Sequence, residues 1–311
     1  MKISVVGAAG YVGSNVAVTL ALQGIADEIV LIDPPKTNII TQFAMDVGTA
    51  AARRNQNVRA GEMDEMKGSH IVIVAAGAPQ GFINSRMEML PKNMPIIRDV
   101  AENIKKLAPY SIVITATNPV DPLNYLMYRQ TGFDRSKIIG YSSNDTLRFR
   151  QIIAQTFGHD YADVAGFIIG EHGESQVPFF STVLVKDNSI HIDNTTRQQI
   201  RTQIGEVLRR FEELKTGRTA GITSAIGIRD IVRAIQNNTH EIIPSSAILD
   251  GEYGQHDISM GVPLVLGSGG IIEIKELKPA PDELPYLDKT IEVVKNAIRQ
   301  VNDFLGVPSK E

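Results

Sequence analysis

The sequence predicts an α/β fold in two parts: a parallel β-sheet with crossover helices over residues 1–142, and an α+β domain over residues 143–311. Short Val- and Ile-rich runs without polar alternation, typical of strands buried on both faces, predict the sheet. Longer stretches with helical spacing separate these runs, as expected of parallel strands joined by helices. The second part lacks this regular alternation, and 311 residues exceed the usual size of one core.

Four buried strands are expected in the first part. They are Ile3–Val6, Ile29–Ile32, Ile71–Ala75 and Ile112–Ala116. Helical spacing runs over Val12–Leu22 and Pro95–Leu107. A buried helix could imitate any one apolar run, but four runs in regular alternation with helices predict a parallel sheet with right-handed crossovers.

The second part is expected to mix helices and strands. The predicted helices are Asn144–Phe157, an amphipathic Thr196–Leu214, and Leu287–Leu305. The predicted strands are Ala165–Ile169 and Thr182–Val185, and a loop is expected over Pro279–Pro285. Because no repeat or low-complexity linker separates the two parts, we expect them to be tightly joined near residues 140–145.

Composition excludes several classes of site and partner. The absence of cysteine rules out disulfides, thiolate metal sites and a Cys nucleophile, and no metal site is expected. A net charge of -4 and a pI near 5.9 give no reason to expect nucleic acid or an anionic membrane as a partner. The N-terminus enters a strand pattern without signal-peptide features, and no apolar run is long enough to span a bilayer. We therefore expect a cytoplasmic protein.

A glycine-rich turn follows the first strand directly. In Gly7-Ala8-Ala9-Gly10-Tyr11-Val12-Gly13, the glycines allow the tight turn and the close backbone approach that a pyrophosphate needs, and the following helix offers unpaired N–H groups. The G-x-x-G-x-x-G spacing departs from the strict dinucleotide fingerprint, and alone it could reflect only a need for positive φ.

Asp33 supplies the context for this turn, because it ends the second strand twenty residues beyond Gly13. A carboxylate there accepts hydrogen bonds from ribose hydroxyls and repels a 2′-phosphate. Turn and carboxylate together predict a Rossmann domain that binds NAD rather than NADP. The alternative role of Asp33 is to cap the strand end before Pro34-Pro35.

Three further segments and one loop carry a pattern typical of one enzyme family. They are Gly170-Glu171-His172-Gly173-Glu174-Ser175, Asn144-Asp145-Thr146-Leu147-Arg148-Phe149, Thr117-Asn118-Pro119-Val120-Asp121, and the loop from Gly77 to Arg86. With these motifs in place, the chain resembles the lactate/malate dehydrogenase family over essentially its whole length, down to Gly261-Val262-Pro263, and looks closest to its tetrameric, lactate-dehydrogenase-like malate dehydrogenases. The resemblance implies an NAD-dependent oxidoreductase of central carbon metabolism that acts on the CH–OH group of a small L-2-hydroxy acid, with a C-terminal substrate domain.

The resemblance also assigns a catalytic set. His172 matches the acid–base histidine, a role that suits an imidazole because its pKa lies near working pH, and Asp145 matches the carboxylate that orients it. Arg148 lies one helical turn after Asp145 and matches the arginine that grips the substrate carboxylate. Arg86 matches the mobile-loop arginine that closes over the substrate and stabilises charge on its oxygen.

The remaining assignments concern the cofactor. Asn118 matches the asparagine beside the nicotinamide and the substrate oxygen. The expected cofactor-binding residues are Gly7, Gly10, Tyr11, Val12, Gly13, Asp33, Ala76, Gly77 and Asn118. The other histidines, which have no comparable setting and are expected to be structural or exposed, are His70, His159, His191, His240 and His256.

The sequence gives two opposing indications of the substrate. Six residues before Arg86, the family places arginine for dicarboxylates and glutamine for lactate, and this chain has Gln80. Arg218, however, stands where relatives often carry threonine beside the substrate, and from there it could bind the C4 carboxylate of malate. An alignment slip would instead leave Arg218 in solvent. We expect malate/oxaloacetate, with lactate/pyruvate or dual specificity as the alternative.

Two more remote readings stay open at this point. An NAD-dependent glycosidase would be expected to need a divalent metal, and a non-catalytic NAD sensor need not retain the acid–base and arginine set. In every dehydrogenase reading the partner is a small 2-hydroxy or 2-oxo acid, and the resemblance suggests a homotetramer or a homodimer.

Overall fold

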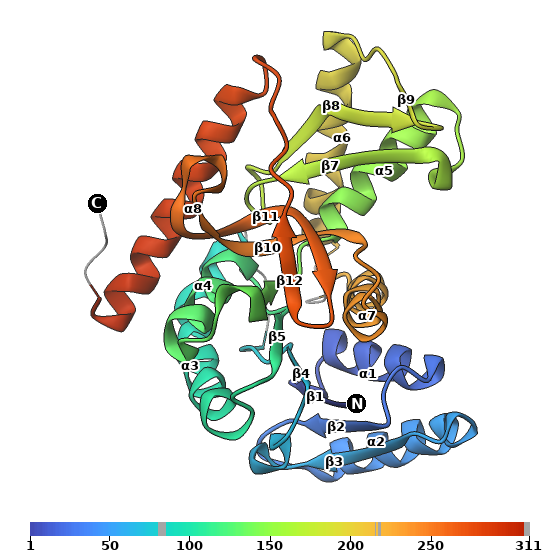
Figure 1. Ribbon diagram of the computed structural model, residues 1–311, viewed down its shortest axis with the longest axis vertical. Coiled ribbons are helices and arrows are strands. Elements are labelled where there is room, and N and C mark those ends of the chain that lie inside the picture. Colours follow the sequence, from blue (N-terminus) through green and yellow to red (C-terminus); the bar gives the residue numbers. More distant parts are fainter. Residues whose placement is uncertain (80–84, 215, 217–218, 308–311) are drawn as a thin grey trace.

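The computed structural model describes residues 1–79, 85–214, 216 and 219–307. A nine-stranded sheet in the order β12-β11-β10-β6-β5-β4-β1-β2-β3 forms the centre, and a three-stranded sheet, β7-β8-β9, lies at one end of the molecule (Figure 1). The α/β class predicted from the sequence is therefore confirmed.

Six parallel strands come from the first half of the chain. They are β1 (Lys2–Val6), β2 (Glu28–Ile32), β3 (Asn57–Gly61), β4 (Ile71–Val74), β5 (Ile112–Thr115) and β6 (Ile138–Gly140). The four predicted strands are confirmed as β1, β2, β4 and β5. We missed β3 and β6, because Asn57–Gly61 has one apolar branched residue and Ile138–Gly140 is too short for a periodic signal.

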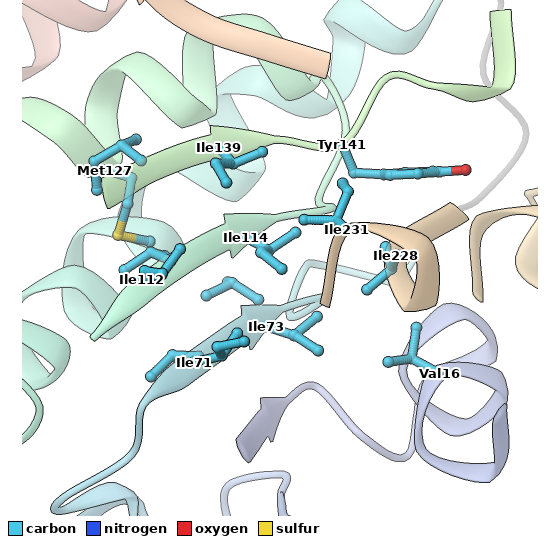
Figure 2. Packing of buried hydrophobic residues seen from close by; sticks show 14 of the residues in the cluster. Val16, Ile71, Ile73, Ile112, Ile114, Met127, Ile139, Tyr141, Ile228 and Ile231 are labelled. Atoms are coloured by element: carbon cyan, nitrogen blue, oxygen red, sulfur yellow. The ribbon is translucent and has the colours of Figure 1, made fainter. Parts of the chain in front are cut away.

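The connecting helices are α1 (Tyr11–Gln23), α2 (Asn38–Ala51), α3 (Leu90–Leu107) and α4 (Val120–Thr131). The predicted helices near Val12–Leu22 and Pro95–Leu107 are confirmed as α1 and α3. Figure 2 shows how isoleucines of neighbouring strands, Ile73 and Ile114 among them, stack into one apolar layer that continues to Ile228 and Ile231 of α7 (Gly221–Asn237). This packing fixes the positions of the loops that leave the sheet.

Strands from the second half extend the first sheet. β10 (Ile242–Asp250) pairs antiparallel with β6 and with β11 (His256–Gly267), which in turn pairs with β12 (Gly270–Ile274). These strands were not predicted from the sequence. β10 and β11 are buried along most of their length, so they lack the alternation that marks a half-exposed strand, and Pro, Ser and Gly residues also interrupt their apolar runs.

The second half also builds a smaller layer. The strands β7 (Val164–Ile169), β8 (Val177–Val185) and β9 (Asn188–Ser189) pack with α5 (Asn144–Phe157) and α6 (Asn194–Glu213), as Figure 1 shows. Their core includes Phe149 and Phe180, whose rings meet edge to face at 5.6 Å. The predicted helices of this half are confirmed as α5, α6 and α8 (Leu284–Leu305), and the predicted strands as β7 and part of β8.

One loop boundary was wrong. The loop expected over Pro279–Pro285 ends at Glu283, because Pro285 occupies the first turn of α8, where a proline has no helical hydrogen bond to lose. Within the described part of the chain, no helix combines the length and the apolar character that crossing a membrane requires.

Candidate active site

The expected site residues gather at the carboxyl edge of the parallel strands. The sheet order reverses between β1 and β4, since the chain proceeds outward to β3 on one side and to β6 on the other. In open α/β sheets a crevice forms at such a switch point. The glycine turn after β1 and the Ala76-Gly77 segment after β4 flank this crevice.

The glycine turn has the geometry of a phosphate cradle. Gly7 has φ +83°, and a Cβ on it would lie 2.4 Å from the backbone nitrogen of Ala76. A Cβ on Gly13 would lie 2.3 Å from the carbonyl oxygen of Gly7. Gly10 precedes α1 without a side-chain cap, and the first turn of α1 carries no acidic residue. The turn thus leaves N–H groups and the positive helix end for an anion.

Asp33 follows β2 at the same edge, two strands from β4. Burial raises the pKa of its carboxyl, and a hydrogen bond from the Ala9 backbone opposes this rise. The carboxylate therefore lies beside the glycine turn, where ribose hydroxyls attached to a bound pyrophosphate would meet it. The two features fit a dinucleotide.

Asn93 of α3, which we missed in the sequence, joins the loops after β4 and β5. Its Oδ1 accepts a hydrogen bond from the Ala78 N–H at 2.8 Å, and its Nδ2 donates to the Asn118 carbonyl at 2.7 Å. Asn118 Oδ1 is buried and has no hydrogen-bond partner among the described residues. A buried amide oxygen in that state is an acceptor that a bound ligand can satisfy. The only sequence signal for Asn93 was a polar residue on the apolar face of α3.

His172 and Asp145 form a buried pair. His172 comes from the segment between β7 and β8, and Asp145 from the first turn of α5, yet His172 Nδ1 lies 2.6 Å from Asp145 Oδ2. Both residues are buried. Burial alone would raise the pKa of Asp145, but His172, Arg86 and Arg148 outweigh it and hold that pKa below its usual value. Asp145 is therefore a carboxylate, and it accepts the Nδ1 proton of the imidazole.

Gly170 sets the position of the His172 segment. It exchanges two backbone hydrogen bonds with Gly261 of β11, at 2.9 and 2.8 Å, and so ties the small layer to the large sheet. Its φ is +98°, and a Cβ there would lie 2.5 Å from the Thr290 side chain. Glycine is thus required on both steric and conformational grounds.

Two guanidinium groups stand beside the pair. Arg148 Nη1 lies 3.6 Å from Asp145 Oδ1, and Arg86 Nη1 donates to the His172 carbonyl at 3.2 Å. Burial lowers the pKa of Arg148, and the positive charge of Arg86 lowers it further, while Asp145 opposes both. An anion bound between the two guanidinium groups would reduce the electrostatic repulsion between them. The arrangement can therefore bind a carboxylate next to a proton-transferring imidazole.

Asp121 holds the backbone of His172. It belongs to the Thr117–Asp121 motif, but no role was predicted for it from the sequence. Its Oδ2 accepts the His172 N–H at 2.6 Å, and its Oδ1 accepts the Ser246 hydroxyl at 2.6 Å. Burial raises the pKa of Asp121 to about 7, against the effect of these two hydrogen bonds. The only indication of this role in the sequence was the presence of an acidic residue within the motif.

The structure brings together His172, Asp145, Arg148 and Arg86, and it places the cofactor-side residues along one edge of the sheet. Tyr11 begins α1, and its ring packs against Gly221 of α7. Gln80 and Arg218, the two residues expected to decide the substrate, lie outside the described residues. Among the described residues, no group of three or more His, Asp or Glu side chains could hold a metal ion.

Two family models match the chain. Residues 1–140 match the model described as lactate/malate dehydrogenase, NAD binding domain, and residues 143–305 match lactate/malate dehydrogenase, alpha/beta C-terminal domain. Together they cover both halves of the site described above.

Individual relatives are similar over nearly the full length. Malate dehydrogenase of Halobacterium salinarum is 35% identical over 94% of this chain and 96% of its own length. L-lactate dehydrogenase 2 of Enterococcus faecalis is 33% identical over 96% of each. The apo malate dehydrogenase structure from Picrophilus torridus has a TM-score of 0.90 at 31% identity, covering 98% of each chain. A Cryptosporidium parvum lactate dehydrogenase structure, complexed with lactic acid and nicotinamide adenine dinucleotide, has a TM-score of 0.90 at 28% identity, covering 97% of this chain and 98% of its own.

Proposed function

Because the chain belongs to the lactate/malate dehydrogenase family and is an NAD-dependent dehydrogenase of 2-hydroxy acids, we propose that its substrate pair is malate and oxaloacetate. The match over both halves argues against a glycosidase and against a sensor that has lost the chemistry. The observation that carries the proposal for the site is the buried His172–Asp145 pair with two guanidinium groups beside it.

We assign proton transfer to His172. With the Nδ1 proton donated to Asp145, the Nε2 lone pair is free to take the hydroxyl proton during alcohol oxidation. The imidazolium formed then lies against the Asp145 carboxylate, which stabilises its charge. In the reverse direction Nε2 returns the proton to the carbonyl oxygen. Asp145 is a positioning residue that fixes the tautomer and the ring plane.

Arg148 and Arg86 divide the work of anion recognition. Arg148 is largely buried at the base of the site, so it suits a bidentate hold on the C1 carboxylate. Arg86 lies in the 3-10 helix Arg86–Met89, next to the His172 carbonyl, so it suits stabilisation of charge on the substrate C2 oxygen. Their joint charge also draws an anionic substrate toward the imidazole.

NAD supplies the acceptor or donor of the hydride. The glycine turn from Gly7 to Gly13 would hold its pyrophosphate and Asp33 its adenosine ribose, while Ala76, Gly77 and Asn118 would line the nicotinamide end. The steric cradle at Gly7 and the unpartnered Asn118 Oδ1 support this assignment.

Malate is favoured over lactate by the relatives at 35% identity, which are malate dehydrogenases from Halobacterium salinarum and Haloarcula marismortui. Gln80 argues for lactate, and the Enterococcus faecalis relative is a lactate dehydrogenase. We propose that Arg218, rather than residue 80, binds the C4 carboxylate, since a dicarboxylate needs one cation beyond those that hold C1 and the C2 oxygen.

Steady-state rates with NADH test the substrate. We expect kcat/KM for oxaloacetate to exceed that for pyruvate, and Arg218→Ala to lower the oxaloacetate value while leaving the pyruvate value close to wild type. Gln80→Arg is the matched variant at the other position. A wild-type preference for pyruvate would refute the malate assignment, and an Arg218→Ala enzyme with full oxaloacetate activity would refute the role of Arg218.

We further propose that the protein works in the cytoplasm as a homotetramer, with a homodimer as the alternative. Apolar side chains exposed on α2 and α7, among them Ile39, Met45 and Ile222, support subunit contacts. Sedimentation equilibrium gives the subunit number directly, and a monomer at micromolar concentration would contradict the proposal.

A further inference from the structure

A cavity of ≈ 750 Å³ adjoins the catalytic histidine on the side of α6 and α8. His172 and Arg86 line one wall, and Arg201 of α6 and Lys289 of α8 line another. Apolar residues, including Ile204 and Val294, and polar residues, including Glu171 and Glu174, form the rest of the lining. The cavity is therefore continuous with the site described above but extends beyond the residues assigned to the substrate.

Arg201 is an unusual residue in this wall. Its Nε and Nη2 atoms are buried and have no hydrogen-bond partner among the described residues. The guanidinium is fixed by stacking, with its carbon 5.0 Å from the Phe180 ring centroid and 4.3 Å from that of Tyr286. Aromatic stacking holds the plane of a guanidinium but does not satisfy its N–H donors. Arg201 thus contributes to the cavity wall a rigid, charged guanidinium whose N–H donors are not all satisfied.

Arg197, one helical turn earlier, provides the comparison within the same helix. It stacks on the same Phe180 ring at 5.4 Å, but it also pairs with Asp282 at 2.5 Å and donates to the Ile192 carbonyl at 2.9 Å. Packing against Phe180 is therefore compatible with full pairing in this fold. Arg201 forms no ion pair with any described residue, so its charge is not explained by its neighbours.

We propose that Arg201 binds a carboxylate group inside this cavity, beside His172. A planar guanidinium matches the two oxygens of a carboxylate, and the ammonium of Lys289, which forms no ion pair within the described part of the chain, adds a second positive charge to the cavity wall. The apolar part of the lining favours an organic anion with a carbon skeleton over an inorganic ion. The carboxylate belongs either to the distal end of the substrate, which Arg201 would then hold together with Arg218, or to a separate polycarboxylate.

Citrate is a suitable probe, because its tertiary alcohol cannot be oxidised by loss of a hydride. We expect isothermal titration of the full chain with citrate, in the presence of NADH, to show binding that weakens by about tenfold or more in Arg201→Met, since a charge-assisted bidentate contact is lost. Arg197→Met is the matched control and retains wild-type citrate affinity. Lys289→Met, at an exposed position on α8, gives a second variant should Arg201→Met fail to fold.

Kinetics with oxaloacetate and pyruvate identify the source of the carboxylate. A fall in kcat/KM for oxaloacetate alone in Arg201→Met assigns the group to the substrate. Unchanged rates with both, together with lost citrate binding, assign it to a separate anion. Wild-type citrate affinity and wild-type rates in both Arg201→Met and Lys289→Met would overturn the inference. Titration does not require turnover, so citrate binding can be measured in an inactive His172→Asn enzyme. Citrate binding that is retained in this variant supports the anion site independently of the proposed function.

Discussion

His172 Nδ1 and Asp145 Oδ2 lie 2.6 Å apart, although the two residues are 27 positions apart in the sequence. The first turn of α5 presents Asp145, and the Gly170–Gly261 exchange of hydrogen bonds brings the His172 segment to it. The position of the imidazole proton follows from this contact, because an acceptor at Nδ1 leaves the lone pair at Nε2.

Asp145→Asn tests this relationship. An amide can donate to Nδ1 and so favours the wrong tautomer, and it cannot stabilise the imidazolium. We expect kcat to fall ~10²–10⁴-fold, the range of general acid–base catalysis. Absorbance of NADH during oxaloacetate reduction measures the rate, and the dissociation constant of NADH is the control, which stays at the wild-type value. A variant that keeps full kcat would contradict the assignment.

Arg148→Gln and Arg148→Lys separate charge from geometry at the carboxylate subsite. Loss of one partner of a buried charged contact typically costs ~2–5 kcal/mol, so kcat/KM in Arg148→Gln should fall by ~30-fold or more. Lysine keeps the charge but lacks the planar guanidinium. We therefore expect kcat/KM of Arg148→Lys to lie between the values of wild type and Arg148→Gln. Equal values for the lysine variant and wild type would show that the planar geometry is not used.

Asp33→Ser tests the choice between NAD and NADP. The serine removes the charge that repels a 2′-phosphate and weakens the hold on the ribose hydroxyls. We expect the dissociation constant of NADH to rise ~10–100-fold, the ~1.5–3 kcal/mol of a hydrogen bond to a charged group, while that of NADPH falls. Fluorescence titration of both cofactors measures the ratio. An unchanged ratio would place the ribose elsewhere.

The sequence predicted the part of the site that is carried by contiguous motifs. His172, Asp145, Arg148 and Arg86 each lie within a short recognisable segment. Four of the six parallel strands were predictable for the same reason, because burial on both faces leaves a run of Val and Ile.

Contacts between distant segments were not predictable. Asn93 joins two loops from a helix, Ser246 reaches Asp121 across 125 residues of sequence, and Arg201 stacks between Phe180 and Tyr286. Each is an ordinary polar or charged residue in a helix or strand, and its setting depends on packing rather than on local pattern. The addition of β10 and β11 to the first sheet escaped prediction likewise, since these strands show neither a period of two nor an unbroken run of Val and Ile.

The pH dependence of stability tests Asp121. The pKa of this carboxyl is about 7 in the fold, raised by burial, against 3.8 for an unperturbed Asp. Between these values the folded chain binds a proton that the unfolded chain has released, so the free energy of unfolding decreases as pH rises from about 4 to about 7. Asp145 acts in the opposite sense and at lower pH, because its lowered pKa gives stability that is lost only as pH falls below 3.8.

Asp121→Asn removes the contribution of Asp121 to the pH dependence of stability and leaves that of Asp145. The neutral amide can still accept the His172 N–H through its oxygen, so the fold and the position of the histidine are expected to persist. Urea titrations at several pH values should show the wild type losing stability relative to Asp121→Asn as pH rises from 4 to 7, with a constant difference above pH 8. Ser246→Ala sharpens the measurement, because loss of the hydroxyl donor raises the pKa of Asp121 further and moves the decline to higher pH. Parallel stability profiles for wild type and Asp121→Asn across this range would show that Asp121 is already ionised in the fold at pH 4, and that its hydrogen bonds to His172 and Ser246 offset its burial in full.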